Sequence, residues 1–173
     1  MGYYFYSVCR ALAWFGGLVL VLIAIGSVVS IIGRALIPWG LGPIPGDFEL
    51  VEAGTALAVF SFLPWCHLKR SHAVVDMLWN HYPERLKSAL GMFTDILMLV
   101  IWSLIVWRMS VGLTNYHENG EVSFILQMPV WWGYAAAFGP ALIGCLAAGW
   151  RLLETLGVAE PPIGFEHDPT AAH

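Results

Sequence analysis

The sequence predicts an all-α integral membrane protein with four transmembrane helices, an interfacial amphipathic segment between helices two and three, and both termini in the cytoplasm. Three observations carry this prediction: an apolar composition, four apolar stretches of membrane-spanning length, and basic residues gathered in alternate connections. Hydrophobic residues make up 58% of the 173 residues and charged residues only 12%, whereas soluble domains average about 25% charged residues. So few charges cannot cover a water-exposed surface, and we expect lipid to solvate much of the chain.

Four stretches are long enough to cross a bilayer, whose hydrocarbon core of about 30 Å takes about 20 residues at about 1.5 Å each. They are roughly 11–33, 48–68, 88–107 and 129–150. We expect them to form one transmembrane domain, 1–159, with antiparallel neighbours, because the connections between them are short. The polar, proline-containing stretch 160–173 is predicted to be a disordered cytoplasmic tail.

Basic residues set the predicted orientation, because short cytoplasmic connections carry an excess of Lys and Arg. Arg10 precedes the first span and Arg151 follows the fourth. Four more basic residues lie between the second and third spans: Lys69, Arg70, Arg85 and Lys87. Arg34 and Arg108 remain for the opposite side. With an even number of spans, both termini are then cytoplasmic.

The second span begins with two carboxylates, Glu49 and Glu52, which are three residues apart and share one helix face. Arg34 leaves the first span on the same side of the membrane. An ion pair between Arg34 and one of these carboxylates would lower the cost of placing charge at the membrane edge. The alternative is that water solvates all three groups separately.

A segment between the second and third spans, 71–82, is predicted to be amphipathic and to lie in the membrane interface. Its apolar residues fall on one helical stripe, and basic residues flank it. The residues assigned to this segment and its flanks are Lys69, Arg70, His72, Asp76, Trp79 and Pro83. Nearby, Cys66, His67 and His72 lack the spacing and the fourth ligand of a standard zinc site, so no metal is expected there.

Asp95 is the acidic residue that lies well inside the third span. A carboxylate inside the membrane is costly, which makes it by default a candidate for function. We expect Asp95 to be neutral and bonded to a hydroxyl or backbone group, in this chain or in a partner. Ion coupling is the alternative interpretation.

The fourth span repeats small residues every four positions, which places them on one helix face. They are Gly133, Ala137, Ala141, Cys145 and Gly149. Another helix can approach such a face closely and gain dispersion contacts. The sequence leaves open whether this face packs within the chain or docks a separate membrane subunit.

No catalytic chemistry is predicted for this chain. It contains no Walker A loop, Rossmann fingerprint, GxSxG or HExxH motif. Its six histidines fall at span ends, in loops or in the tail, so no histidine pair stands in mid-membrane to hold a haem. A net charge of −4, with the few basic residues in loops, argues against nucleic acid as a partner. We therefore expect neither enzyme activity nor a cofactor.

Several segments follow one another in a recognisable order. They are Arg34 after the first span, the acidic opening FELVE with Glu49 and Glu52, the segment KRSHAVVDMLWNHYPERLK, and the proline–aromatic entry ILQMPVWWGYAAAFGPAL to the last span. This arrangement, from about Arg10 to Trp150, resembles the small permease subunit (DctQ type) of tripartite ATP-independent periplasmic, or TRAP, transporters.

The resemblance implies a heterocomplex in the bacterial inner membrane, whose large permease subunit carries the substrate path and the sodium sites. A soluble periplasmic binding protein would deliver the ligand, typically an organic anion such as a dicarboxylate. The small subunit would brace the static scaffold among membrane lipids and hold no cofactor itself. The alternatives are the membrane anchor of a respiratory redox enzyme, or a small channel or stand-alone carrier.

Overall fold

The computed structural model describes residues 2–69 and 84–158, and the regular secondary structure of these residues is helical. The elements are α1 (Gly2–Ala35), the 3-10 helix η1 (Ile37–Trp39), α2 (Asp47–Leu68), α3 (Glu84–Asn119) and α4 (Val130–Thr155). All four α-helices are long and apolar enough to cross a membrane, which confirms the predicted all-α fold with four spans. The predicted interfacial segment, 71–82, and the predicted tail, 160–173, lie outside the described residues.

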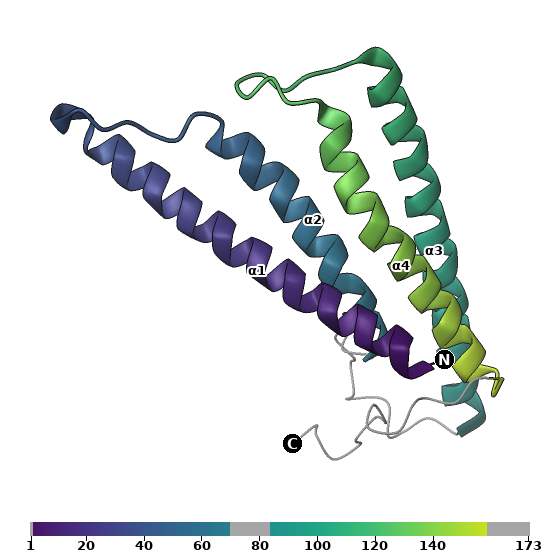
Figure 1. Ribbon diagram of the computed structural model, residues 1–173. Helices are drawn as coiled ribbons and strands as arrows, with labels where there is room; N and C mark the ends of the chain where they lie inside the picture. Colours follow the sequence, from purple (N-terminus) through teal and green to yellow (C-terminus); the bar gives the residue numbers. More distant parts are fainter. Residues whose placement is uncertain (1, 70–83, 159–173) are drawn as a thin grey trace, which may run out of the picture.

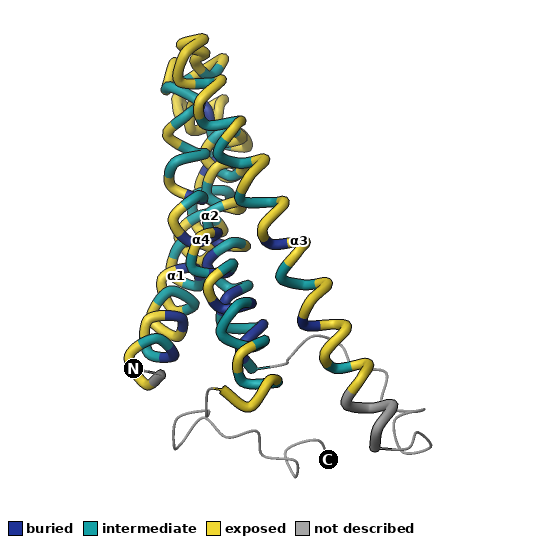
Figure 2. Tube along the Cα trace, turned by 90° about the vertical axis from the view of Figure 1, so that its right-hand side faces the viewer, coloured by how far each residue is buried: buried dark blue, intermediate teal, exposed yellow. Residues whose placement is uncertain are grey.

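The four helices form two hairpins that meet along one seam. α1 packs on α2, α3 packs on α4, and α2 packs on α4 to join the hairpins. In the view of Figure 1 the helices converge at one end and spread apart at the other, whereas in the perpendicular view of Figure 2 α3 diverges from the other helices at the end that is narrow in Figure 1; the two ends are named after the view of Figure 1. The converged end holds the N-terminal ends of α1 and α3 and the C-terminal ends of α2 and α4; the splayed end holds the connections 36–46 and 120–129.

Proline and glycine mark the helix ends. α1 stops before η1, where Pro38 cannot supply the N–H that a continuing helix needs. Gly46 precedes α2 with a φ of 72°, a left-handed conformation that glycine adopts at little cost. α3 runs well past residue 107, the predicted end of the third span, because no proline interrupts it before Gly120, whose φ is 63°.

Small residues allow the helices to approach closely. Where α1 crosses α2, a Cβ on Gly16 would lie 2.8 Å from the Cβ of Ser61, so the two backbones are in direct contact. On α4, the Trp102 ring of α3 lies on the bare Cα of Gly144. Trp102 is 5% exposed, and its ring stands edge-on to Phe60 of α2 with the centroids 6.4 Å apart. This one indole therefore joins three of the four helices.

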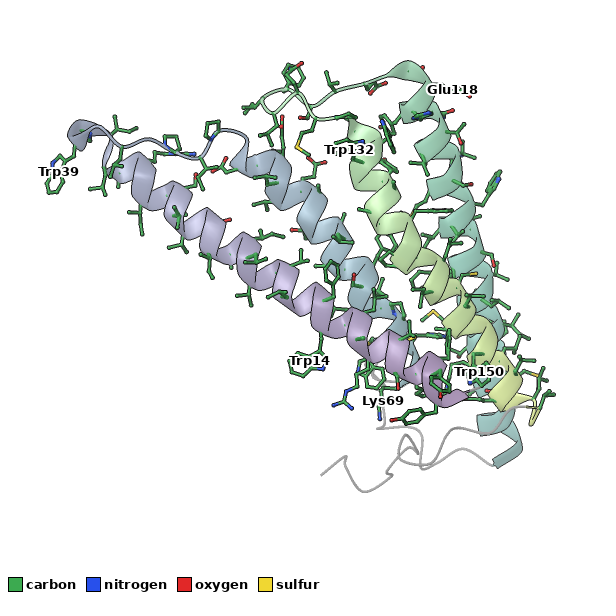
Figure 3. All side chains as sticks on the ribbon, viewed as in Figure 1. Trp14, Trp39, Lys69, Glu118, Trp132 and Trp150 are labelled. Carbon is green, nitrogen blue, oxygen red and sulfur yellow. The ribbon has the colours of Figure 1, made fainter. Side chains whose placement is uncertain are left out.

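The outer faces of α1 and α3 are apolar. Figure 2 shows exposed residues along both helices, while most buried residues lie in the middle of the molecule and toward the end that holds the N-terminal end of α1 and the C-terminal ends of α2 and α4. Large exposed side chains include Leu22 and Ile25 on α1 and Val100 and Leu104 on α3. In water such faces would be a liability, whereas in a membrane they suit lipid tails or another membrane protein. Trp39 and Trp132 at the splayed end and Trp150 at the converged end (Figure 3) lie where aromatic belts meet the headgroups.

Replacing Gly144 with Ala should destabilise the protein, because the added methyl group would displace the Trp102 ring. Overpacking of this kind costs about 1–3 kcal/mol, and we expect the free energy of unfolding in detergent micelles to fall by that amount. Gly139→Ala is the matched control, since nothing lies within 4 Å of a Cβ at that position on the same helix. Equal stability of the two variants would show that the packing of the Trp102 ring does not require a glycine at position 144.

Candidate functional site

The carboxylate of Glu49, in the first turn of α2, ties the splayed end together. Its Oε1 accepts a hydrogen bond from the backbone N–H of Ile125 at 2.7 Å. Its Oε2 accepts one from the Ser123 hydroxyl at 2.7 Å and one from the N–H of Leu126 at 3.0 Å. All three donors belong to the α3–α4 connection. Glu49 therefore fastens the loop of the second hairpin to the first hairpin.

The α3–α4 connection is folded so that its donors point at one place. The N–H of Ser123 donates to the carbonyl of Met128 at 2.8 Å, which closes the loop on itself. Gln127, with a φ of 54°, donates from its side-chain amide to the carbonyls of Ser123 and Phe124, both at 3.1 Å. Successive N–H groups presented by a tight turn form an anion-binding concavity. Here the anion is a carboxylate of the same chain.

Arg34 forms its ion pair with a different acid from those expected. Its Nη2 lies 3.8 Å from Oδ2 of Asp47, at the start of α2. The sequence predicted an ion pair of Arg34 with Glu49 or Glu52, but Glu49 is bound by the loop donors, and the ion pair of Arg34 is formed with Asp47. The Ser30 hydroxyl, buried on α1, donates to the same oxygen of Asp47. Because the Arg34 side chain is 66% exposed, its ion pair contributes little, and the Ser30 contact makes the firmer link between α1 and α2.

Glu52 lies one turn further along α2 and is exposed. At the same end of the molecule, aromatic contacts hold α3 and α4 together. The rings of Tyr116 and Tyr134 lie with centroids 4.8 Å apart, and those of His117 and Trp131 meet edge-on at 5.1 Å. These pairs account for the length of α3, since its last turns have α4 to pack against.

A second carboxylate, Glu154 of α4, joins the hairpins at the converged end. Its Oε1 accepts hydrogen bonds from the Tyr6 hydroxyl of α1 and from the Trp150 indole, both at 2.8 Å. Its Oε2 lies 2.6 Å from Nη1 of Arg151, and the Arg151 and Glu154 side chains are only 12% and 6% exposed. The two hairpins are thus linked at both ends by a carboxylate: the α3–α4 connection donates to Glu49 of the first hairpin, and Tyr6 of α1 donates to Glu154 of the second, where Trp150 and Arg151 of α4 itself complete the contacts.

Asp95 is buried near the converged end, where the Thr155 hydroxyl at the end of α4 donates to its Oδ2. The hydroxyl group expected beside Asp95 is therefore that of Thr155, in this chain. The contact links α3 to α4 within the second hairpin, as the Ser30–Asp47 contact links α1 to α2 within the first.

The small-residue face of α4 is packed inside the chain. Ala137 and Ala141 are 2% and 0% exposed. A Cβ on Gly133 would lie 3.7 Å from α2, and one on Gly149 would lie 4.0 Å from Leu99 of α3. All five predicted members of this face are described residues of α4: Gly133, Ala137, Ala141, Cys145 and Gly149. Packing within the chain is therefore observed for Ala137 and Ala141, whereas Gly133, Cys145 and Gly149 are half-buried; docking of a separate subunit on this face stays a prediction.

Of the residues assigned to the interfacial segment, the structure describes Lys69, whose Nζ lies 5.4 Å from the centroid of the Trp65 ring. The others lie outside the described residues: Arg70, His72, Asp76, Trp79 and Pro83. His67, considered as a metal ligand, is buried at the end of α2. Within residues 2–69 and 84–158, no group of three or more His, Cys, Asp or Glu residues is placed to hold a metal ion.

Sequence reasoning missed the groups that meet these carboxylates. Asp47 follows Gly46 at a helix start, where an acid is favoured by the helix dipole, and this position could have singled it out. Tyr6 and Ser123 are separated from their acids by 148 and 74 residues. No local pattern in one sequence connects residues so far apart.

The family model of the DctQ component of tripartite ATP-independent periplasmic transporters matches residues 23–157 of this chain. The matched region contains α2, α3, α4 and the last part of α1 (23–35), and with them Glu49, Glu154 and Asp95. No curated protein and no solved structure matches the chain. The family match gives no support to the alternative of a respiratory membrane anchor.

Replacing Glu49 with Gln should loosen the loop 120–129, because the amide has no charge and offers an NH₂ group where an acceptor is needed. We expect the N–H groups of Ile125 and Leu126 to exchange with deuterium at least about tenfold faster, since hydrogen bonds to a charged group contribute about 1.5–3 kcal/mol. Glu52→Gln, at the exposed acid of the same face, is the control. Wild-type exchange in both variants, measured by mass spectrometry, would mean that Glu49 does not hold the loop.

Replacing Glu154 with Leu should lower the free energy of unfolding by about 3–5 kcal/mol, because Arg151 would remain buried without its carboxylate. The double variant R151M/E154L removes both charges, and we expect it to recover much of the loss. Glu118→Leu, at an exposed acid of α3, should change stability by less than about 0.5 kcal/mol. A double variant as unstable as E154L would contradict the buried ion pair as the cause.

Proposed function

Because this chain belongs to the DctQ family of tripartite ATP-independent periplasmic transporters, we propose that it braces the large permease subunit of such a transporter. The transporter would use sodium to import an organic anion delivered by a periplasmic binding protein. The match over residues 23–157 is the observation that carries this proposal. The substrate path and the sodium sites are assigned to the large subunit, and this chain contributes no catalytic step.

The packing of the chain supports a bracing role. Glu49 and Glu154 fix the two hairpins to each other at opposite ends of the α2–α4 seam. Between these points, Trp102 fills the space left by Gly144 and reaches Phe60 of α2. Interlocked contacts of this kind resist shear between the hairpins, because close-packed interiors are discrete arrangements that do not deform continuously. A scaffold that must stay still while its partner moves needs this property.

The placement of charge supports an orientation for the proposed subunit. Arg10, Lys69 and Arg151 all lie toward the converged end. By the excess of basic residues on the cytoplasmic side, this end faces the cytoplasm and the splayed end faces the periplasm. The membrane would then be the bacterial inner membrane, with the Glu49 loop on the side from which a binding protein approaches.

We expect the large subunit to contact the exposed faces of α1 and α3, and not the small-residue face of α4. The small residues of α4 are already covered by α2 and α3. α1 and α3 carry the exposed apolar faces, at residues such as Leu22 and Leu104. A partner that covers one of these faces would replace lipid contacts by protein contacts without exposing polar groups.

A tagged full-length chain, extracted from native membranes in mild detergent, should co-purify with a much larger polytopic membrane protein. Liposomes containing both proteins, with the binding protein outside, should accumulate an organic anion when a sodium gradient is applied, and liposomes containing this chain alone should not. The control is an unrelated membrane protein of four spans carrying the same tag. Transport by this chain alone, or its recovery without any large partner, would contradict the proposal.

A further inference from the structure

An open groove runs along α1 and α2 from the converged end toward mid-membrane. Its volume is about 690 Å³, within the range of about 300–1,000 Å³ typical of ligand pockets, so it can hold part of a sizeable molecule. Arg10 stands at one end and Val21 at the other. Between them the wall is apolar or glycine: Ala13, Trp14, Gly17 and Leu18 of α1, with Phe62 and Trp65 of α2.

The length and polarity of this groove fit an amphiphile that lies in one leaflet. From Arg10 to Val21 the helix advances eleven residues, or about 16 Å at about 1.5 Å each. One leaflet contributes about half of the roughly 30 Å hydrocarbon core. The length of the groove along α1 therefore matches the thickness of one leaflet. The guanidinium of Arg10 lies at the end that we call its mouth, and apolar side chains line the rest of its length.

A second cation lies near the mouth. Lys69 follows the end of α2, and its Nζ lies over the ring of Trp65, a residue of the groove wall. Trp14, on the opposite wall, is 73% exposed and projects away from the helices, as Figure 3 shows. Indole rings favour the headgroup depth of a bilayer. The mouth thus combines two positive charges with two interfacial anchors.

We propose that this groove binds a phospholipid of net negative charge, with one acyl chain between α1 and α2 and the headgroup phosphate beside Arg10 and Lys69. Charge complementarity selects this occupant. A helix of a partner protein would place apolar residues along the whole groove and would press them against the charged side chain of Arg10 at its mouth. The bound lipid would lie along the outside of the contact that α1 and α2 make at Gly16. This inference does not rest on the proposed transport function.

The test measures how much phosphatidylglycerol the purified full-length chain retains in native mass spectrometry after delipidation and re-addition of defined lipid. Gly17→Leu should abolish retention, because the new side chain would extend into the groove. A Cβ at residue 17 would lie 3.9 Å from Cε1 of Phe62, on the groove wall. Gly26→Leu is the matched control, since a Cβ on that residue of α1 meets nothing within 4 Å. Equal retention by the two variants would overturn the proposal.

The charge requirement is tested separately. Arg10→Gln and Lys69→Gln should each weaken phosphatidylglycerol binding about fivefold, the effect expected of one cation at an anionic membrane surface. Arg108→Gln, at an exposed cation distant from the groove, should leave binding unchanged. Phosphatidylcholine, whose headgroup has no net charge, should bind the wild-type chain more weakly. Equal binding of the two lipids, or loss of the lipid when a large permease subunit co-purifies, would overturn the proposal, the latter by assigning the groove to a protein interface.

Discussion

The seam between α2 and α4 is the contact on which the rest of the molecule depends. Each hairpin has only two helices, and neither can enclose its own small residues without the other. In lipid, no expulsion of water drives helices together, so association relies on close packing and hydrogen bonds. The seam supplies both: small residues in its middle, and Glu49 and Glu154 at its ends. The Glu154 side chain is only 6% exposed, so its hydrogen bonds face little competition from water.

Four acidic residues of the described part of the chain act as acceptors that hold helices in place. Asp47 accepts from α1, Asp95 from α4, Glu49 from the α3–α4 connection and Glu154 from α1. Two of these contacts close a hairpin and two join the hairpins. An intramembrane acid therefore need not mark an ion path. In this protein the cost of placing such groups in the membrane is offset by the directional contacts that they make.

The number of helices could be predicted because apolar length and composition determine it directly. The partner of each polar side chain could not. Asp47, Glu49 and Glu52 all begin the same helix, and which of them faces Arg34 depends on how α2 is rotated against α1. Likewise, the four-residue repeat on α4 predicts a close approach but not the helix that makes it. In the structure this face meets two helices: Gly133 lies beside Ala53 of α2, and Gly149 beside Leu99 of α3.

The helices spread apart at opposite ends of the molecule in two perpendicular directions. In Figure 1, α1 leans away from the second hairpin toward the splayed end, and in Figure 2, α3 leans away from the other helices toward the converged end. The long direction of the cross-section therefore turns between one end of the helices and the other. In a bilayer, the lipids of the two leaflets would meet differently oriented protein boundaries, and any assembly built on this chain inherits that asymmetry.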